Sequence, residues 1–242
     1  MKKFKLALVL FAFNSFVFSV GEIGDLYFYK VTPGKAEEAN ALMEEGRLLG
    51  QETGMNVIIH SQSFGRGGDN VLSWFEIYDD YEQRAQTKYT SDKWNAYTEK
   101  FYASDSLTAT KSYQLIALDT IVPGDYIVTN YMWQPNKGKR NETLAALERA
   151  KIAFEKHGFI VDLWEHNAGS KHALQFTFLS TSMENQAKSF ASLATDEDWL
   201  IERDRWFNGE WARLVDSYEM TNTNLNNYYL RCRKLKLATF MI

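Results

Sequence analysis

One cysteine, three prolines and fourteen glycines occur among the 242 residues of the chain. The single thiol, Cys232, excludes an intrachain disulfide and paired-cysteine redox chemistry. The scarcity of proline and glycine argues against collagen-like repeats and long irregular loops. Basic residues do not outnumber acidic ones, and a formal net charge of −4 provides no electrostatic basis for binding nucleic acid.

Aromatic side chains are abundant. Phe, Tyr and Trp make up 15% of the sequence, within a hydrophobic fraction of 45%. This composition is typical of a globular chain and not of a disordered or multi-span membrane protein. Because the length suits two domains of about 100 residues each, we expect two well-packed cores.

The first 19 residues have the pattern of a secretory signal peptide. Three lysines precede an apolar stretch at 6–13 that is too short to span a bilayer. Small residues at Val17 and Ser19 predict cleavage after Ser19, a secreted or periplasmic location and no membrane span in the mature protein. Loss of the three lysines changes the formal charge from −4 to −7. The alternatives are an uncleaved anchor and a buried N-terminal strand.

The mature chain contains an internal repeat. Pro33 matches Pro135 at an offset of 102 residues, and Trp94 matches Trp199 at an offset of 105, with three further landmarks between and after them in the same order. Such agreement indicates a duplication with small loop insertions. The predicted organisation is a signal peptide at 1–19, unit 1 at 20–120, unit 2 at 121–220 and a C-terminal tail at 221–242.

Each unit reads as strand, helix, strand, strand, helix, strand. In the first helical segment, Ala39, Leu42 and Met43 fall on one face, and Gly54 stands where a C-terminal cap belongs; Gly158 is its counterpart in unit 2. This order of elements is the ferredoxin-like motif, in which helices cover one face of a four-stranded antiparallel sheet. The predicted fold class is therefore α+β.

Three segments resemble a known group of proteins. They are the first strand with its continuation at 31–38, the strand containing Trp74-Phe75-Glu76, and the helix that begins at Ser91-Asp92-Lys93-Trp94. Together they resemble the dimeric α/β-barrel superfamily, and within it the antibiotic-biosynthesis-monooxygenase-like group. The resemblance implies two tandem ferredoxin-like units whose sheets pack face to face as an intrachain barrel. It also implies a site either between the sheets or in the sheet–helix cavity of each unit.

Strand alternation sorts the candidate site residues by face. Residues 58, 60 and 62 share one face of their strand, residues 162, 164 and 166 share the matching face in unit 2, and both faces mix polar and aromatic groups. We expect these faces, together with the tyrosines of the two first strands, to enclose a pocket for a flat organic molecule. Space filling by the aromatic groups is the alternative. The predicted ligand-binding residues are Tyr29, His60, Trp74, Tyr131, Trp164 and His166.

Other constellations give no reaction. Asp162, His166 and His172 are three potential metal ligands, but their spacing matches no compact metal signature. The glycine-rich stretch at 65–68 lacks the Lys-Ser/Thr of a phosphate loop and reads as a hairpin turn. A Gly-x-Ser-x-Gly nucleophile motif is missing from the sequence. We predict no metal and no cofactor, and the catalytic residues stay unassigned.

The tail differs in composition from the two units. An Asn- and Thr-rich linker at 221–227 precedes four positive charges at Arg231, Arg233, Lys234 and Lys236. This segment either docks on an acidic partner or membrane surface, or packs along the acidic body of the protein.

Three functions fit these features. The first is a binding protein for a small hydrophobic or aromatic ligand, the second a cofactor-independent monooxygenase-like enzyme, and the third a non-catalytic interaction module with a solid interior. Whether the protein is an enzyme is left open by the sequence. We expect a monomer or a homodimer.

Overall fold

The computed structural model describes residues 21–65, 70–87, 91–122, 124–170, 172–209 and 211–223. The predicted signal peptide at 1–19, Cys232 and the basic cluster of the tail lie outside the described residues, as does the glycine-rich stretch at 66–68. Within the described residues the two predicted units appear as two copies of one arrangement.

Unit 1 alternates strands and helices in the predicted order, with one additional short helix, α2. Its elements are β1 (Ile23–Val31), α1 (Ala36–Glu52), β2 (Asn56–Phe64), β3 (Val71–Tyr78), α2 (Tyr81–Thr87), α3 (Asp92–Ala103) and β4 (Leu107–Ala117).

Unit 2 repeats this order, and its α5 takes the place of α2. Its elements are β5 (Ile127–Pro135), α4 (Arg140–Lys156), β6 (Ile160–Ala168), β7 (Leu174–Ser180), α5 (Met183–Leu193), α6 (Glu197–Phe207) and β8 (Ala212–Asn222).

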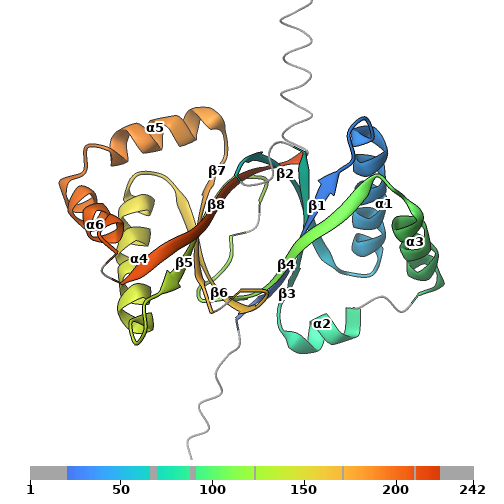
Figure 1. Ribbon diagram of the computed structural model, residues 1–242, viewed down its shortest axis with the longest axis horizontal. Coiled ribbons are helices and arrows are strands. Elements are labelled where there is room, and N and C mark those ends of the chain that lie inside the picture. The colour runs from blue at the N-terminus through green and yellow to red at the C-terminus, as the bar shows by residue number, and fades with distance from the viewer. Residues whose placement is uncertain are drawn as a thin grey trace, which may run out of the picture.

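The eight strands form one closed antiparallel barrel in the order β1-β3-β2-β8-β5-β7-β6-β4 (Figure 1). Pairs β2–β8 and β4–β6 join the two units at their edges. The predicted α+β fold, two ferredoxin-like units that build an intrachain barrel, is confirmed. The sheets also hydrogen-bond edge to edge, so that equivalent strands of the two units stand opposite each other around the ring.

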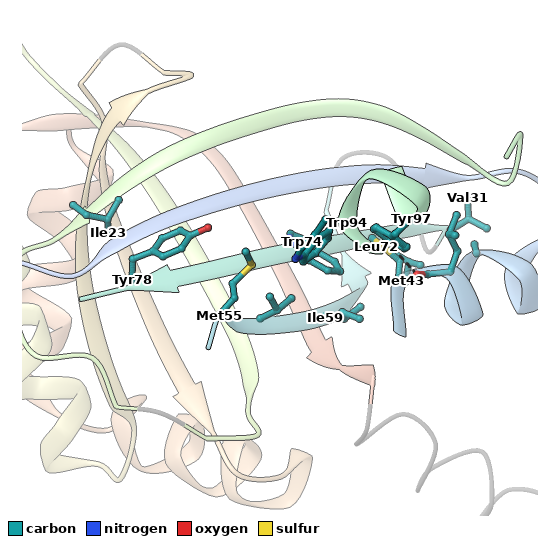
Figure 2. Close-up of a cluster of buried hydrophobic side chains, with 13 residues drawn as sticks. Ile23, Val31, Met43, Met55, Ile59, Leu72, Trp74, Tyr78, Trp94 and Tyr97 are labelled. Carbon is teal, nitrogen blue, oxygen red and sulfur yellow. Dashed lines mark hydrogen bonds between the residues drawn. The ribbon is translucent and has the colours of Figure 1, made fainter. Parts of the chain in front are cut away.

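The helices pack on the outside of the barrel, with α1 and α3 on unit 1 and α4, α5 and α6 on unit 2 (Figure 1). Their apolar faces build one sheet–helix core in each unit. Figure 2 shows Trp74 of β3 gathered with Trp94 and Tyr97 of α3 in the core of unit 1. None of the helices in the described part of the chain is long and apolar enough to cross a membrane.

Glycine and side-chain caps set the helix ends. Gly54 and Gly158 have φ of 78° and 89°, so the predicted ends of α1 and α4 are confirmed. Ser91 and Asp196 accept hydrogen bonds from the backbone N–H of Trp94 and Trp199, at 3.3 Å and 2.9 Å, and begin α3 and α6.

The structure corrects one part of the repeat alignment. β5 begins 104 residues after β1, so the turn residue Gly34 corresponds to Gly138, and not Pro33 to Pro135. Both glycines have positive φ, 81° and 76°, because they make the same tight turn before a helix. The shift is of two residues, which leaves the face of every side chain in the strand unchanged.

Candidate functional site

The barrel contains a cavity of about 480 Å³ at the end where β1 and β5 begin. Residues from both units line this cavity. Residues 118–122 and 124–126, between the two units, lie at this end of the barrel, and Ile121, Val122 and Tyr126 contribute to the lining (Figure 1). The cavity is therefore a space that the duplication itself creates.

The wall from unit 1 is apolar at the level of Leu26, Phe75 and Ile58, while Glu22, Arg47 and His60 of the same unit line other parts of the cavity. Leu26, Phe75 and Ile58 lie side by side on the neighbouring strands β1, β3 and β2, and all three line the cavity. Alternation turns their neighbours Val57 and Ile59 toward the helices, which confirms the predicted assignment of faces in β2.

The wall from unit 2 is polar at the corresponding level. Asn130, Thr177 and Asp162 lie side by side on β5, β7 and β6, and they too line the cavity. The Thr177 hydroxyl donates to Asn130 Oδ1 at 2.7 Å, and Gln175 Nε2 donates to the same oxygen at 2.8 Å. Asn130 Nδ2, although buried, has no hydrogen-bond partner. The wall therefore presents an unused donor.

Asp162 presents an unused acceptor. Its side chain is only 4% exposed, and Oδ1 has no hydrogen-bond partner. Burial, followed by the negative charge of Asp119, raises its pKa to about 7, while a hydrogen bond from the backbone of Val122 acts in the opposite direction. The carboxyl group therefore takes up and releases a proton near neutral pH.

His60 lines the cavity from β2. Its Nδ1 lies 3.5 Å from the Ser73 hydroxyl. Burial lowers its pKa to about 4, so that the imidazole is neutral at physiological pH. A neutral imidazole can accept or donate one hydrogen bond at each nitrogen, according to its tautomer.

Trp164 and His166 also point into the barrel, as predicted. The Trp164 ring meets Phe75 edge-on, with centroids 5.6 Å apart, and lines the cavity. His166 lies deeper, with Nε2 3.1 Å from Gln175 Oε1. Burial lowers the pKa of His166 to about 4. His166 therefore lies between the polar wall, which it contacts at Gln175, and the filled part of the barrel.

Packed side chains fill the other end of the barrel. Lys111 pairs with Asp216 at 3.0 Å, and its ammonium group lies 4.4 Å from the centre of the Phe28 ring. Tyr218 packs edge-on against Phe28 with centroids 5.3 Å apart. The cavity thus ends inside the barrel.

The expectation that Tyr29 and Tyr131 share this interior with His60 is wrong. Both tyrosines face the helices, as does Trp74. Tyr29 and Trp74 line a separate cavity of about 320 Å³ in unit 1, whereas Tyr131 lines one of about 250 Å³ in unit 2. Both faces of the first strands carry large apolar residues, and alternation alone does not say which face is inside.

A buried carboxylate organises the sheet–helix cavity of unit 1. The Trp74 indole N–H and the Tyr78 hydroxyl each donate to Glu76 at 2.8 Å. Burial, with Tyr102 and Glu76 nearby, raises the pKa of Tyr29 well above its ordinary value. The phenol is therefore neutral, and its hydroxyl is a hydrogen-bond donor.

The potential metal ligands of the sequence do not form a site. Asp162 and His166 share the inner face of β6, whereas His172 lies in the exposed turn before β7 with φ of 53°. Within the described ranges, no three His, Cys, Asp or Glu side chains are grouped so as to hold a metal ion.

Sequence reasoning missed most of the polar wall. Asn130, Gln175 and Thr177 were not among the predicted residues, and Asp162 was placed on the inner strand face and considered as a metal ligand but was not among the predicted ligand-binding residues. The available signal was the alternation of β7, in which Gln175 and Thr177 stand between the core residues Leu174, Phe176 and Phe178. Polar residues at every second position of a fully buried strand indicate a polar layer on its second face.

The sequence matches no protein-family model, and no curated protein matches it significantly. Solved structures do resemble it. A putative monooxygenase from Fusobacterium nucleatum superposes with a TM-score of 0.60 at 10% identity, covering 85% of this chain and 95% of the other.

Two further structures show the same arrangement. An anthrone oxidase-like protein has a TM-score of 0.53 at 14% identity, with 83% of this chain and 91% of the other covered. A heme-binding protein from Thermus thermophilus has a TM-score of 0.51 at 11% identity, with 84% and 91% covered. At these identities the likeness shows the fold. The chain has the dimeric α/β-barrel fold, with both halves of the barrel supplied by one duplicated chain.

Proposed function

We propose that the protein binds a small aromatic molecule in the barrel cavity between its two units. One observation carries this proposal: Asp162 Oδ1 and Asn130 Nδ2 are buried and unpartnered on one wall of a cavity whose opposite wall is apolar. An unsatisfied buried polar group costs about 1–3 kcal/mol. Ligand sites commonly combine apolar walls with a few such polar groups, which fix the orientation of the ligand.

Three naphthalene probes test the proposal: 2-naphthylmethylamine, 2-naphthalenemethanol and 2-naphthoate. We expect at least one to bind with one-to-one stoichiometry in calorimetry and to change tryptophan fluorescence. Trp164 lines the cavity, so Trp164→Phe should remove most of the fluorescence change while leaving the calorimetric binding in place.

Substitution Thr177→Phe blocks the cavity with a ring like that of Phe75 in unit 1, and should abolish binding. The matched control is Thr108→Phe at an exposed position of β4, which should bind like the native protein. The proposal fails if none of the probes binds, or if Thr177→Phe binds them unchanged.

An oxygenase-like enzyme is the second candidate. It is supported by the names of the fold neighbours, which include putative monooxygenases and an anthrone oxidase-like protein. The pKa of Asp162, about 7, suits a base that removes a proton from a weakly acidic ring carbon. Dioxygen would be the co-reactant: anthrone and one O₂ give anthraquinone and one H₂O.

Oxygen consumption with anthrone tests this candidate. Turnover above the rate of autoxidation, reduced at least tenfold in Asp162→Asn, would support it. A rate equal to that of buffer alone would contradict it and leave binding as the function.

Haem does not fit the two sheet–helix cavities. The sheet–helix cavities, of about 320 Å³ and 250 Å³, are lined without histidine or cysteine. Their phenols favour the protonated form, whereas a tyrosine ligand binds iron as phenolate. Outside these cavities, both ring nitrogens of His157 are engaged, by Ser192 and Asp196. Neither proposed function therefore involves haem.

We also propose that the protein is exported. Support comes from the basic and apolar pattern of residues 1–19. Expression of the full chain with its own N-terminus should yield a mature protein that begins near Val20 in the extracellular or periplasmic fraction, as measured by intact mass. An unprocessed chain in the cytoplasm would contradict the proposal.

A further inference from the structure

The cavity is lined by more acidic than basic side chains. Glu22, Asp125 and Asp162 contribute carboxylates, and Arg47 contributes a guanidinium. Arg47 donates to Glu44 of its own helix at 2.7 Å, so its charge is already balanced. The space between the two walls therefore has an excess of negative charge.

All three carboxylates receive a hydrogen bond from an uncharged donor, which for Asp162 is the backbone of Val122. The backbone N–H of Ile121 donates to Glu22 at 3.1 Å, and the Asn222 amide donates to Asp125 at 2.7 Å. Asp162 differs because its Oδ1 is buried without a partner. Lys151, whose charge acts on Asp162, forms its ion pair with Asp119 at 2.5 Å. A residue that lines the cavity thus carries an acceptor with neither a hydrogen bond nor an ion pair of its own.

Building on the proposed binding function, we propose that the cavity selects an organic cation: a protonated amine on an aromatic body, with the ammonium group donating to Asp162 Oδ1. The aromatic body would lie against Leu26 and Phe75 and beside Trp164. Cations are attracted to the faces of aromatic rings, and the attraction grows when both groups are removed from water.

The geometry of the polar wall adds a second requirement. Asn130 and Asp162 stand on either side of Thr177 in the same row. Two strand spacings of about 4.8 Å separate them, which is roughly 10 Å between their Cα atoms. A ligand that also carries a hydroxyl or carbonyl oxygen beyond the amine would satisfy Asn130 Nδ2. The ligand class is therefore an aromatic amine with an oxygen acceptor along one edge.

A cation fits better than a neutral or anionic molecule. An ammonium group next to Asp162 replaces the lost hydration of the carboxylate with a charged hydrogen bond, which is about twice as strong as a neutral one. A neutral alcohol supplies the hydrogen bond without the charge. An anion would meet the carboxylates of Glu22, Asp125 and Asp162.

Affinity should depend on pH in a defined direction. The pKa of Asp162 is raised by burial and by Asp119 and Glu22, and is lowered by Lys151 and by the hydrogen bond from Val122. The histidines of the barrel, His60 and His166, are neutral above about pH 4. Because the cation binds ionised Asp162, affinity should rise about tenfold per pH unit up to about 7 and then level off.

The three naphthalene probes, titrated at pH 8 and pH 6, test this inference. We expect 2-naphthylmethylamine to bind at least tenfold more tightly than 2-naphthalenemethanol at pH 8, with 2-naphthoate weakest. Asp162→Asn should reduce the preference for the amine to less than threefold, because the affinity for the amine falls much more than the affinity for the alcohol. The control Asp216→Asn, at the filled end of the barrel, should keep the tenfold preference.

The remaining outcomes contradict either the selectivity for cations or the binding function itself. Equal binding of the amine and the alcohol, or a preference that persists in Asp162→Asn, would overturn the selectivity for cations while leaving the proposed binding function in place. Tightest binding of 2-naphthoate would do the same. If no probe binds, the binding function fails, and the inference fails with it.

Discussion

The two walls of the barrel cavity come from equivalent strands, yet their chemistry differs. Unit 1 contributes Leu26, Phe75 and Ile58, whereas unit 2 places Asn130, Thr177 and Asp162 in the matching row. All six residues line the same space. The duplication has therefore produced one amphipathic cavity and not two similar halves.

The opposite faces of the same strands have kept their character. Val57 and Ile59 correspond to Val161 and Leu163, and all four pack against helices. Every volume change there alters the packing of a helix on a sheet and costs stability. Side chains that border the cavity are under less steric constraint, so divergence has accumulated on the inner face.

The largest effect is expected from removing the charge of the polar wall. The pKa of Asp162 is about 7 in the folded protein against an ordinary 3.8, so between pH 4 and 7 the native state retains a proton that the unfolded chain has lost. The contribution of Asp162 to stability therefore falls as pH rises through this range, by up to about 4 kcal/mol.

Substitution Asp162→Asn removes this loss. The variant should be more stable than the native protein at pH 8 and equal to it at pH 4, as measured by urea denaturation. The exposed control Asp204→Asn should change stability by less than about 0.5 kcal/mol at both values. A variant that is less stable at pH 8 would contradict the account of Asp162.

The second largest change in stability is expected at His166. Unit 1 has Gln62 at the equivalent position, so His166→Gln gives both units the same residue there. Burial lowers the pKa of His166 from 6.5 to about 4, so that below pH 6.5 the unfolded chain gains a proton first. The contribution of His166 to stability therefore falls as pH falls from 6.5 to 4, by up to about 3 kcal/mol, and opposes that of Asp162.

Substitution His166→Gln should flatten the stability curve over this interval in urea titrations at several pH values. His172→Gln, at an exposed turn position, is the control and should leave the slope as it is. An equally steep curve for His166→Gln would show that this histidine does not carry the acid sensitivity.

A smaller effect is expected from the hydroxyl of the polar wall. Thr177→Val removes hydrogen bonds to Asn130 at 2.7 Å and from Gln175 at 3.1 Å, with little change in volume. The expected loss is about 1–2 kcal/mol in thermal or urea denaturation. Thr108→Val on exposed β4 should cost less than about 0.5 kcal/mol; equal losses in both variants would contradict a special role of the network.

The smallest change in stability is expected at Lys111 and Asp216, two equivalent positions with opposite charges. Lys111 of β4 and Asp216 of β8 pair at 3.0 Å and are 28% and 15% exposed. Lys111→Asp alone should destabilise the protein by about 1 kcal/mol or more, and adding Asp216→Lys should restore most of the loss. A double-mutant cycle measures the coupling, and a value of zero would show that the pair is dispensable.

Much of the architecture follows from the sequence because it depends on repeated patterns. The duplication, the strand–helix order and the caps at Gly54 and Gly158 are local signals that recur about one hundred residues apart. The inward orientation of His60 and Trp164 follows from alternation, since the alternate residues at the centres of their strands are apolar.

The site was less predictable, for a physical reason. In the first strands both faces carry large apolar residues, so Tyr29 and Tyr131 could not be told from true interior residues such as Phe28. The unpartnered atoms of Asn130 and Asp162 are properties of three strands meeting at one level. The alignment of these strands depends on the closed barrel, so the sequence of any single strand does not predict it.

The linker between the units has a genetic consequence. In a barrel built from two identical chains, a residue near the twofold axis meets its own copy, so every mutation enters the interface twice. Lysine at position 111 would then face lysine. When both halves are encoded in one gene, equivalent positions can mutate independently. The ion pair between Lys111 and Asp216, which occupy equivalent positions, is an example. In a duplicated gene, single mutations can therefore make one wall of the cavity polar without changing the other.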